Sequence, residues 1–205
     1  MMVDVDRIIE SHGELNQDGP GRRGLGHLTR GGVLLLCAAW ELYLEELLVE
    51  AVEVCIARSA TPDSLPEPVK HTISNYIRES KHHFKPLAMS GDGWKEIYRD
   101  VARQSAGKLN TPKHGNIDSM FLGAIGKNNL SAIWSGGVEA IDDFVAARGD
   151  IAHLGREAGY ITINRLRYEY RPHIAHTAIE TDNEVSTYLH GAFEPRRYPW
   201  NRRNI

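Results

Sequence analysis

Residues 40–47 read Trp-Glu-Leu-Tyr-Leu-Glu-Glu-Leu, and they form the middle of the stretch that decides the fold. Around them, apolar residues recur at the spacing of an α-helix, while glutamates fill another face. The apolar positions are Leu36, Trp40, Tyr43, Leu47 and Val54, and the acidic ones are Glu41, Glu45, Glu46, Glu50 and Glu53. This pattern predicts one long helix from about residue 28 to residue 59, which the prolines that follow bring to an end.

Helical periodicity continues along most of the remaining chain. Shorter helices are expected to carry the apolar sets within residues 3–9, 69–77, 94–101, 117–125 and 138–152, and a last helix is expected from near residue 172 to residue 191. Asn116 is a candidate N-cap. The sequence therefore predicts an all-α fold, a helical bundle with long antiparallel helices. Residues 1–192 are expected to form a single domain, and residues 193–205 a basic, mobile C-terminal tail.

Composition and charge narrow the class of protein. The chain has 205 residues and a formal net charge of −3, which argues against a protein that coats nucleic acid, although a local basic patch stays open. Cys37 and Cys55 lie too far apart on one predicted helix to pair, as expected for reduced, cytosolic thiols. The longest apolar run, residues 33–40, is too short to span a bilayer, and no charged-then-apolar leader opens the chain. We therefore expect a cytoplasmic protein without a membrane partner.

The helix predicted over residues 138–154 places an arginine where a core residue is expected. When its residues are projected at about 100° each, Arg148 falls near the middle of an apolar arc. The arc consists of Val138, Ile141, Phe144, Val145, Ile151 and Ala152. A guanidinium keeps its charge, so burial there requires counter-charges, water, a partner chain or an anionic ligand. His153 follows at the end of this helix, and Gly155 suits its C-cap.

Three blocks of sequence together resemble the RiboL-PSP-HEPN family. They are residues 40–47, the run Leu109-Asn110-Thr111-Pro112 followed by Asn116-Ile117 and Phe121, and Arg148 with Ile151-Ala152-His153. The blocks occur in the family's order and span most of the chain. The resemblance implies a HEPN-like helical bundle and, as in many HEPN proteins, a metal-independent endoribonuclease that acts as a homodimer. It also implies a setting in toxin–antitoxin or phage-defence systems, with an antitoxin or a neighbouring defence protein as a candidate partner.

The same resemblance assigns roles to individual residues. Arg148 and His153 are implied to be catalytic, with the motifs of two chains facing each other. Their chemistry suits metal-free RNA cleavage, because a histidine moves protons near neutral pH and an arginine clamps phosphate oxygens. Gly149 stands where the family usually has a polar residue, so Asp150 is the candidate for that supporting role. Glu41 is the candidate carboxylate partner of Arg148.

Helical geometry sets a condition on this site. Five residues turn an ideal helix by about 500°, so the side chains of Arg148 and His153 point about 140° apart. Either the arginine reaches around, or the helix distorts near Gly149, where a glycine makes distortion easier. The spacing of an arginine and a histidine also recurs elsewhere in the chain, so the apolar context of Arg148 carries the signal.

Other interpretations stay open. Arg148 can be a structural arginine paired with an acid, and His153 a solvated residue at a helix end. The chain can be a non-catalytic HEPN-like dimer that binds RNA or protein, or an all-helical regulatory subunit. The tail carries candidate RNA contacts, which are Arg196, Arg197, Trp200, Arg202 and Arg203. Paired histidines such as His173 and His176 lack further ligands at suitable spacing, so no metal site and no cofactor are expected.

Overall fold

The long helix predicted around residues 40–47 is α2 (Gly26–Arg58), and the bundle is built around it. The computed structural model describes residues 1–16, 24–154, 160–193 and 197–204. Within these ranges the chain forms helices joined by loops and no strand. The prediction of an all-α helical bundle is therefore confirmed. None of the described helices combines the length and the apolar character needed to cross a bilayer.

The other helices divide between long bundle members and short turns. The α-helices are α1 (Met2–Leu15), α3 (Glu67–Arg78), α4 (Gly93–Ala106), α5 (His114–Ile125), α6 (Val138–Leu154), α7 (Ile163–Arg165) and α8 (Arg171–Ala192). The 3-10 turns are η1 (Pro62–Ser64), η2 (Lys85–Met89) and η3 (Leu130–Ile133), and η5 (Leu166–Tyr170) is a π-helical turn.

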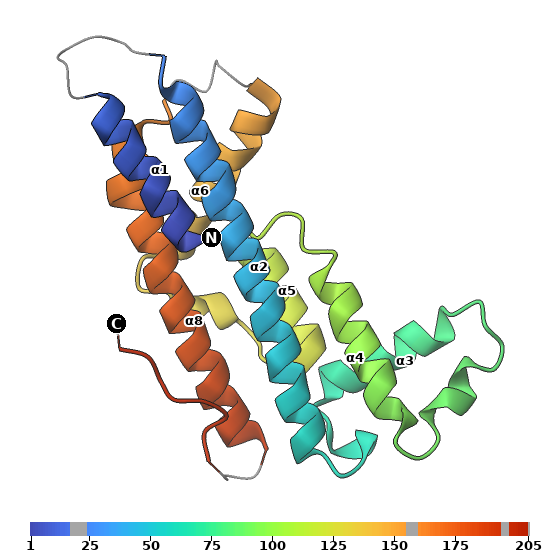
Figure 1. Ribbon diagram of the computed structural model, residues 1–205. Coiled ribbons are helices and arrows are strands. Elements are labelled where there is room, and N and C mark those ends of the chain that lie inside the picture. The colour runs from blue at the N-terminus through green and yellow to red at the C-terminus, as the bar shows by residue number, and fades with distance from the viewer. Residues whose placement is uncertain (17–23, 155–159, 194–196, 205) are drawn as a thin grey trace.

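The helices run in both directions along α2 (Figure 1). α1 and α6 are antiparallel to α2, but α8 is parallel to it. Tyr43 in the first half of α2 donates a hydrogen bond to the Ala178 carbonyl, and Arg58 at its end donates to Leu189 near the end of α8. The long helices α1 and α6 are thus antiparallel to α2 as expected, and α8 is the one of these three that runs parallel to α2. The reason is topological: α6 returns antiparallel to α2, and α8 in turn reverses the direction of α6.

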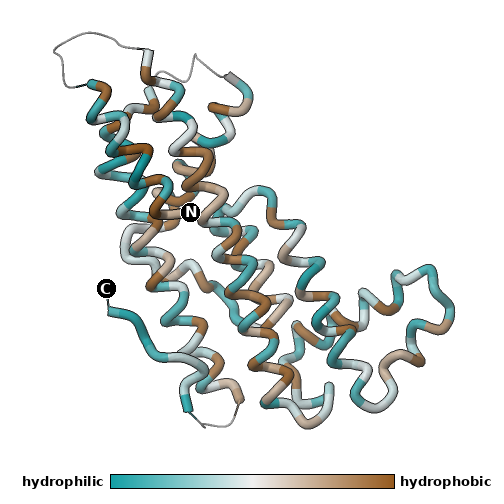
Figure 2. Tube along the Cα trace, in the orientation of Figure 1, coloured by the Kyte–Doolittle hydropathy of each residue, from teal (hydrophilic) through white to brown (hydrophobic). Residues whose placement is uncertain are grey.

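One apolar core holds the bundle together, and α2 contributes to it along its length (Figure 2). Trp40 is completely buried at its centre, stacked on Tyr43 at 5.9 Å and edge-on to Trp134 at 6.1 Å between ring centroids. Both α2 aromatics thus pack as core residues. Cys37 and Cys55 are buried free thiols, as the helix predicted.

The last helical segment begins earlier than the sequence predicts. The expected start was near Pro172, but helical structure already begins at Ile163 and continues through η5 into α8. Thr162 caps this start, since its hydroxyl accepts a hydrogen bond from the Arg165 amide at 3.2 Å. Pro172 cannot donate the amide hydrogen bond of a continuing α-helix, and the π-helical turn just before it interrupts the regular bonding pattern there.

The described part of the C-terminal segment, residues 197–204, lies along α8 and is joined to it by hydrogen bonds. The Asn183 side chain donates to the Arg203 carbonyl at 2.9 Å and accepts from the Arg203 amide at 2.8 Å. The Trp200 indole donates to Asp182 at 2.9 Å. Asp182 and Asn183 are each only 6% exposed. Buried polar groups need hydrogen-bond partners, and the tail supplies them.

Candidate active site

Arg148 lies in a groove between α6 and α2, in the second half of α6. The groove has a volume of about 330 Å³, and its α2 wall consists of Leu34, Cys37, Ala38, Glu41, Leu42 and Glu45. Arg148 is half-buried, whereas Leu34 and Leu42 at the same groove are 40% and 43% exposed. Among the described residues, no side chain or carbonyl makes a direct hydrogen bond or ion pair with its guanidinium. The groove therefore holds a cation whose hydrogen-bond donors stay open to a further acceptor.

The acidic face of α2 gives this groove its charge. Burial and the neighbouring Glu45 raise the pKa of Glu41, and Arg148 opposes them by lowering it. Glu41 and Glu45 are one helical turn apart, so their carboxylates occupy the same face. Burial also raises the pKa of Cys37 to about 11, which keeps this thiol protonated near neutral pH. The groove thus combines one guanidinium with two carboxylates, and it offers no reactive thiolate.

His153 lies in the last turn of α6 and is exposed. The helix runs without a break from Val138 to Leu154, and a side chain added at Gly149 would meet no neighbouring atom. Because α6 is continuous over these residues, ideal helical geometry makes the Arg148 and His153 side chains leave the helix about 140° apart. A reaction that needs both groups at one phosphate requires either a change of conformation or a second chain.

Asp150 has a partner that the sequence did not reveal. The Tyr160 hydroxyl donates a hydrogen bond to this carboxylate, and that bond is the main cause that raises the pKa of Tyr160 to about 12. The guanidinium of Arg165 lies 5.8 Å from the centroid of the Tyr160 ring. Asp150 is therefore linked to the segment that precedes α8. No sequence spacing marks Tyr160, because it lies beyond the end of α6 and outside the helical pattern that contains Asp150.

The described tail residues, 197–204, are not among those that line the groove of Arg148. Arg196 lies outside the described residues, and the Arg197 carbonyl accepts a hydrogen bond of 2.7 Å from Arg58. Trp200 packs against the core, while Arg202 is exposed. Arg203 lies beside Asp182 on the α8 side of α2. The structure thus separates the tail from the candidate catalytic pair.

The histidines of α8 that the sequence analysis considered as metal ligands lie among hydrogen-bonding side chains of the protein. His176 lies 3.3 Å from Glu180 and 3.0 Å from the Ser135 hydroxyl, and both Glu180 oxygens accept from the Ser135 amide. Over the described residues, no three His, Cys, Asp or Glu side chains are grouped as a metal site would require.

Residues 3–187 match the sequence profile of the family described as RiboL-PSP-HEPN. The chain belongs to this family. Comparisons with curated proteins and with solved structures find no match. HEPN domains are helical bundles, and the family is RNA-related and often dimeric.

Two features describe this HEPN chain at its motif. Arg148 and His153, which the resemblance to the family singled out, lie on one continuous helix, α6. The position after the arginine is Gly149, and the next polar residue, Asp150, already accepts a hydrogen bond from Tyr160. This stretch of α6 therefore carries a half-buried arginine and, one turn later, an exposed histidine.

Proposed function

We propose that this HEPN protein is a metal-independent endoribonuclease whose site is shared by two copies of the chain. Arg148 is assigned to phosphate binding and His153 to proton transfer, with Glu41 and Asp150 as supporting residues. The observation that carries the proposal is the half-buried Arg148, which has no direct partner among the described residues and opens into a groove. A guanidinium in that position is suited to bidentate contact with the oxygens of a phosphate.

A second copy of the chain can bring together Arg148 and His153, which are apart on their own helix. In a symmetric dimer the same surface of both chains meets, so Arg148 of one chain can lie near His153 of the other. The exposed leucines beside the groove, Leu34 and Leu42, favour contact with an apolar surface over contact with water alone. Two chains also supply two histidines, one that can act as the base and one that can act as the acid of the cleavage.

The proposed reaction needs no redox partner and no metal. One histidine accepts the proton of the RNA 2′-hydroxyl, and the oxygen forms a bond to phosphorus. The bond from phosphorus to the 5′-oxygen breaks, and the second histidine donates a proton to that oxygen. Arg148 offsets the charge that develops on the phosphorane oxygens. The products are a 2′,3′-cyclic phosphate end and a 5′-hydroxyl end.

The test is incubation of the purified protein with total RNA in EDTA, with the wild type beside His153→Ala. His71→Ala is the matched control, because the His71 side chain is 74% exposed and lies in α3, far along the chain from α6. We expect the wild type and the control to cleave the RNA and to leave cyclic or 3′-phosphate ends. We expect no cleavage by His153→Ala. Activity that disappears in EDTA and returns with Mg²⁺ or Mn²⁺ would refute the mechanism.

A second candidate function is a non-catalytic HEPN-like dimer that binds RNA or another protein. Gly149 and the engagement of Asp150 by Tyr160 favour it, because the polar position of the motif is then occupied within the chain. Wild-type protein that binds RNA in a gel shift and leaves it intact would support this candidate over the nuclease.

For the cellular setting we propose the cytoplasm and a toxin–antitoxin or phage-defence system. The proposed partners are an RNA substrate, a second copy and an antitoxin or neighbouring defence protein. Family membership supports this proposal. Co-purification of the tagged protein with its genomic neighbours, followed by a growth assay with and without them, tests it. A toxin role is contradicted if the wild type and His153→Ala support the same growth, both with and without the neighbouring proteins.

A further inference from the structure

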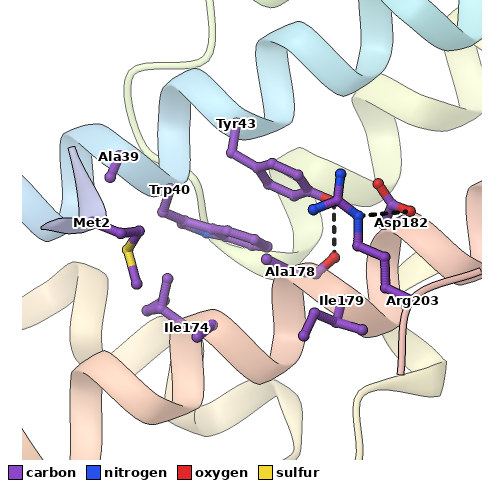
Figure 3. A pocket seen from close by; sticks show the side chains of 10 residues that line it. Met2, Ala39, Trp40, Tyr43, Ile174, Ala178, Ile179, Asp182 and Arg203 are labelled. Carbon is purple, nitrogen blue, oxygen red and sulfur yellow. Dashed lines mark hydrogen bonds and ion pairs between the residues drawn. The ribbon is translucent and has the colours of Figure 1, made fainter. Parts of the chain in front are cut away.

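A second cavity, of about 230 Å³, lies between α2 and α8 (Figure 3). Its α2 residues, Ala39, Trp40 and Tyr43, differ from those that line the groove of Arg148. Most of its wall is apolar and comes from Met2, Ala39, Trp40, Tyr43, Ile174, Ala175, Ala178 and Ile179. Three of these residues are alanines, and their small side chains leave the space open between the two helices. The volume is below the roughly 300–1,000 Å³ of sites for drug-sized ligands, so the cavity suits a compact molecule.

One end of the cavity carries a buried negative charge and an exposed positive charge. The Asp182 side chain is 8% exposed and accepts the Trp200 indole hydrogen bond at 2.9 Å. Arg203 is 68% exposed, and its Nε lies 3.8 Å from the Asp182 carboxylate, which is longer than a direct hydrogen bond. The carboxylate is thus fixed and desolvated, while the guanidinium reaches it from the solvent side.

These features favour an organic cation over an anion. An ammonium group at Asp182 would gain a charge-assisted hydrogen bond away from water, where such bonds are strong. An anion at Arg203 would gain only a solvent-screened contact, and the Asp182 carboxylate would repel it. The faces of Trp40 and Tyr43 also attract cations through their ring electrons. The apolar wall, finally, requires a ligand with an apolar body.

We propose that this cavity binds a compact organic ammonium compound, with its apolar body between Trp40 and α8 and its ammonium group at Asp182. Arg203 of the tail competes with the ligand for the same carboxylate. The site contains neither Arg148 nor His153, so the proposal is independent of the nuclease and stands or falls on its own test.

The test is isothermal titration of the full chain with 2-phenylethylammonium chloride, and with sodium 3-phenylpropionate as the anion of similar shape. We expect saturable binding of the amine at millimolar concentration or below, and at least about tenfold weaker binding of the acid. Equal binding of the two probes, or no saturable binding of the amine, would overturn the proposal.

Three variants test the site, two of which should weaken binding of the amine and one of which should tighten it. Asp182→Asn keeps an acceptor for the Trp200 indole and removes the charge, so the dissociation constant for the amine should rise about tenfold or more. Ala178→Leu fills the cavity and should abolish binding. Arg203→Ala removes the competing cation and should tighten binding several-fold. This last change concerns an exposed side chain, so it is a valid test even where the buried variants unfold. An affinity that Arg203→Ala leaves unchanged or weakens contradicts the proposal.

Discussion

Arg148 of α6 and Glu41 of α2 line one groove from opposite sides, and both are half-buried there. No direct ion pair joins them within the described residues. Arg148 nevertheless lowers the pKa of Glu41 against the larger effects of burial and of Glu45. The groove therefore keeps the guanidinium near negative charge without a direct bond, and the proposed nuclease would use its N–H groups to bind the phosphate of the RNA.

Variants of Arg148 can distinguish a catalytic role of this arginine from a purely structural one. Arg148→Lys keeps the positive charge beside Glu41 but loses the planar fork that binds phosphate through two hydrogen bonds. We expect Arg148→Lys to lower RNA cleavage at least about tenfold and Arg148→Ala at least about 100-fold. Both variants should unfold near the wild-type temperature, since Arg148 makes no direct bond in the described chain. Initial cleavage rates and thermal unfolding measure the two effects. Full activity of the lysine variant would assign Arg148 to charge balance alone.

The helix that carries the motif contains a glycine that its structure does not need. A side chain at Gly149 would meet no atom within 4 Å, so Gly149→Ala should raise the free energy of unfolding by about 0.5–1 kcal/mol through helix propensity. Gly126 is the contrasting control. Its φ is +84°, and a Cβ there would lie 2.6 Å from Pro66, so Gly126→Ala should lower the free energy of unfolding by about 1 kcal/mol or more. Urea unfolding of both variants checks the pair, and a destabilised Gly149→Ala would show that α6 bends at this glycine.

The helices could be predicted because their signal is local. The apolar spacing of α2 lies within the helix itself, and its observed limits differ little from the expected ones. The start of α5 shows where local signals end. The sequence favours Asn116 as its cap, but the helix begins at His114, whose amide donates to Asp142 Oδ1 at 3.0 Å. This cap belongs to another helix, α6, so no pattern within α5 could indicate it.

In the candidate site, too, some residues could be predicted from local sequence and others could not. Arg148 could be singled out because it interrupts an apolar arc on its own helix. The resemblance to HEPN proteins pointed to Glu41, which the fold then places in the same groove. The sequence did not indicate the bonds from Tyr160 to Asp150 and from the tail to Asn183, because each joins a helix to a later segment that has no periodic pattern of its own. Buried polar residues on α8 were a usable sign, since each needs a hydrogen-bond partner.

His173 should make the stability of the fold depend on pH. Burial lowers its pKa from 6.5, with a smaller lowering by His176, and Glu180 opposes both; its Nε2 is buried without a partner among the described residues. The unfolded chain then binds more protons than the folded one just below pH 6.5, so stability is full above this pH and falls as the pH decreases. His173→Phe keeps a flat ring and should reduce the loss of stability between pH 7 and pH 5. Urea unfolding at both pH values measures it. His71→Phe, at a 74% exposed position, is the control and should follow the wild type.

The last prediction concerns a site shared by two chains. The reaction proposed above uses the His153 of both chains at one phosphate, because one histidine acts as the base and the other as the acid. His153→Ala homodimers should therefore be inactive. When equal amounts of wild-type and His153→Ala chains exchange subunits, about half of the dimers become mixed and about a quarter stay wild type in both chains. Only that quarter keeps two histidines, so cleavage should fall on exchange from about half to about a quarter of the rate of the same number of wild-type chains. Light scattering establishes the dimer, and cleavage rates before and after exchange measure the fall. A rate that stays at about half in verified mixed dimers, or a fully active monomer, would contradict a site that needs both chains.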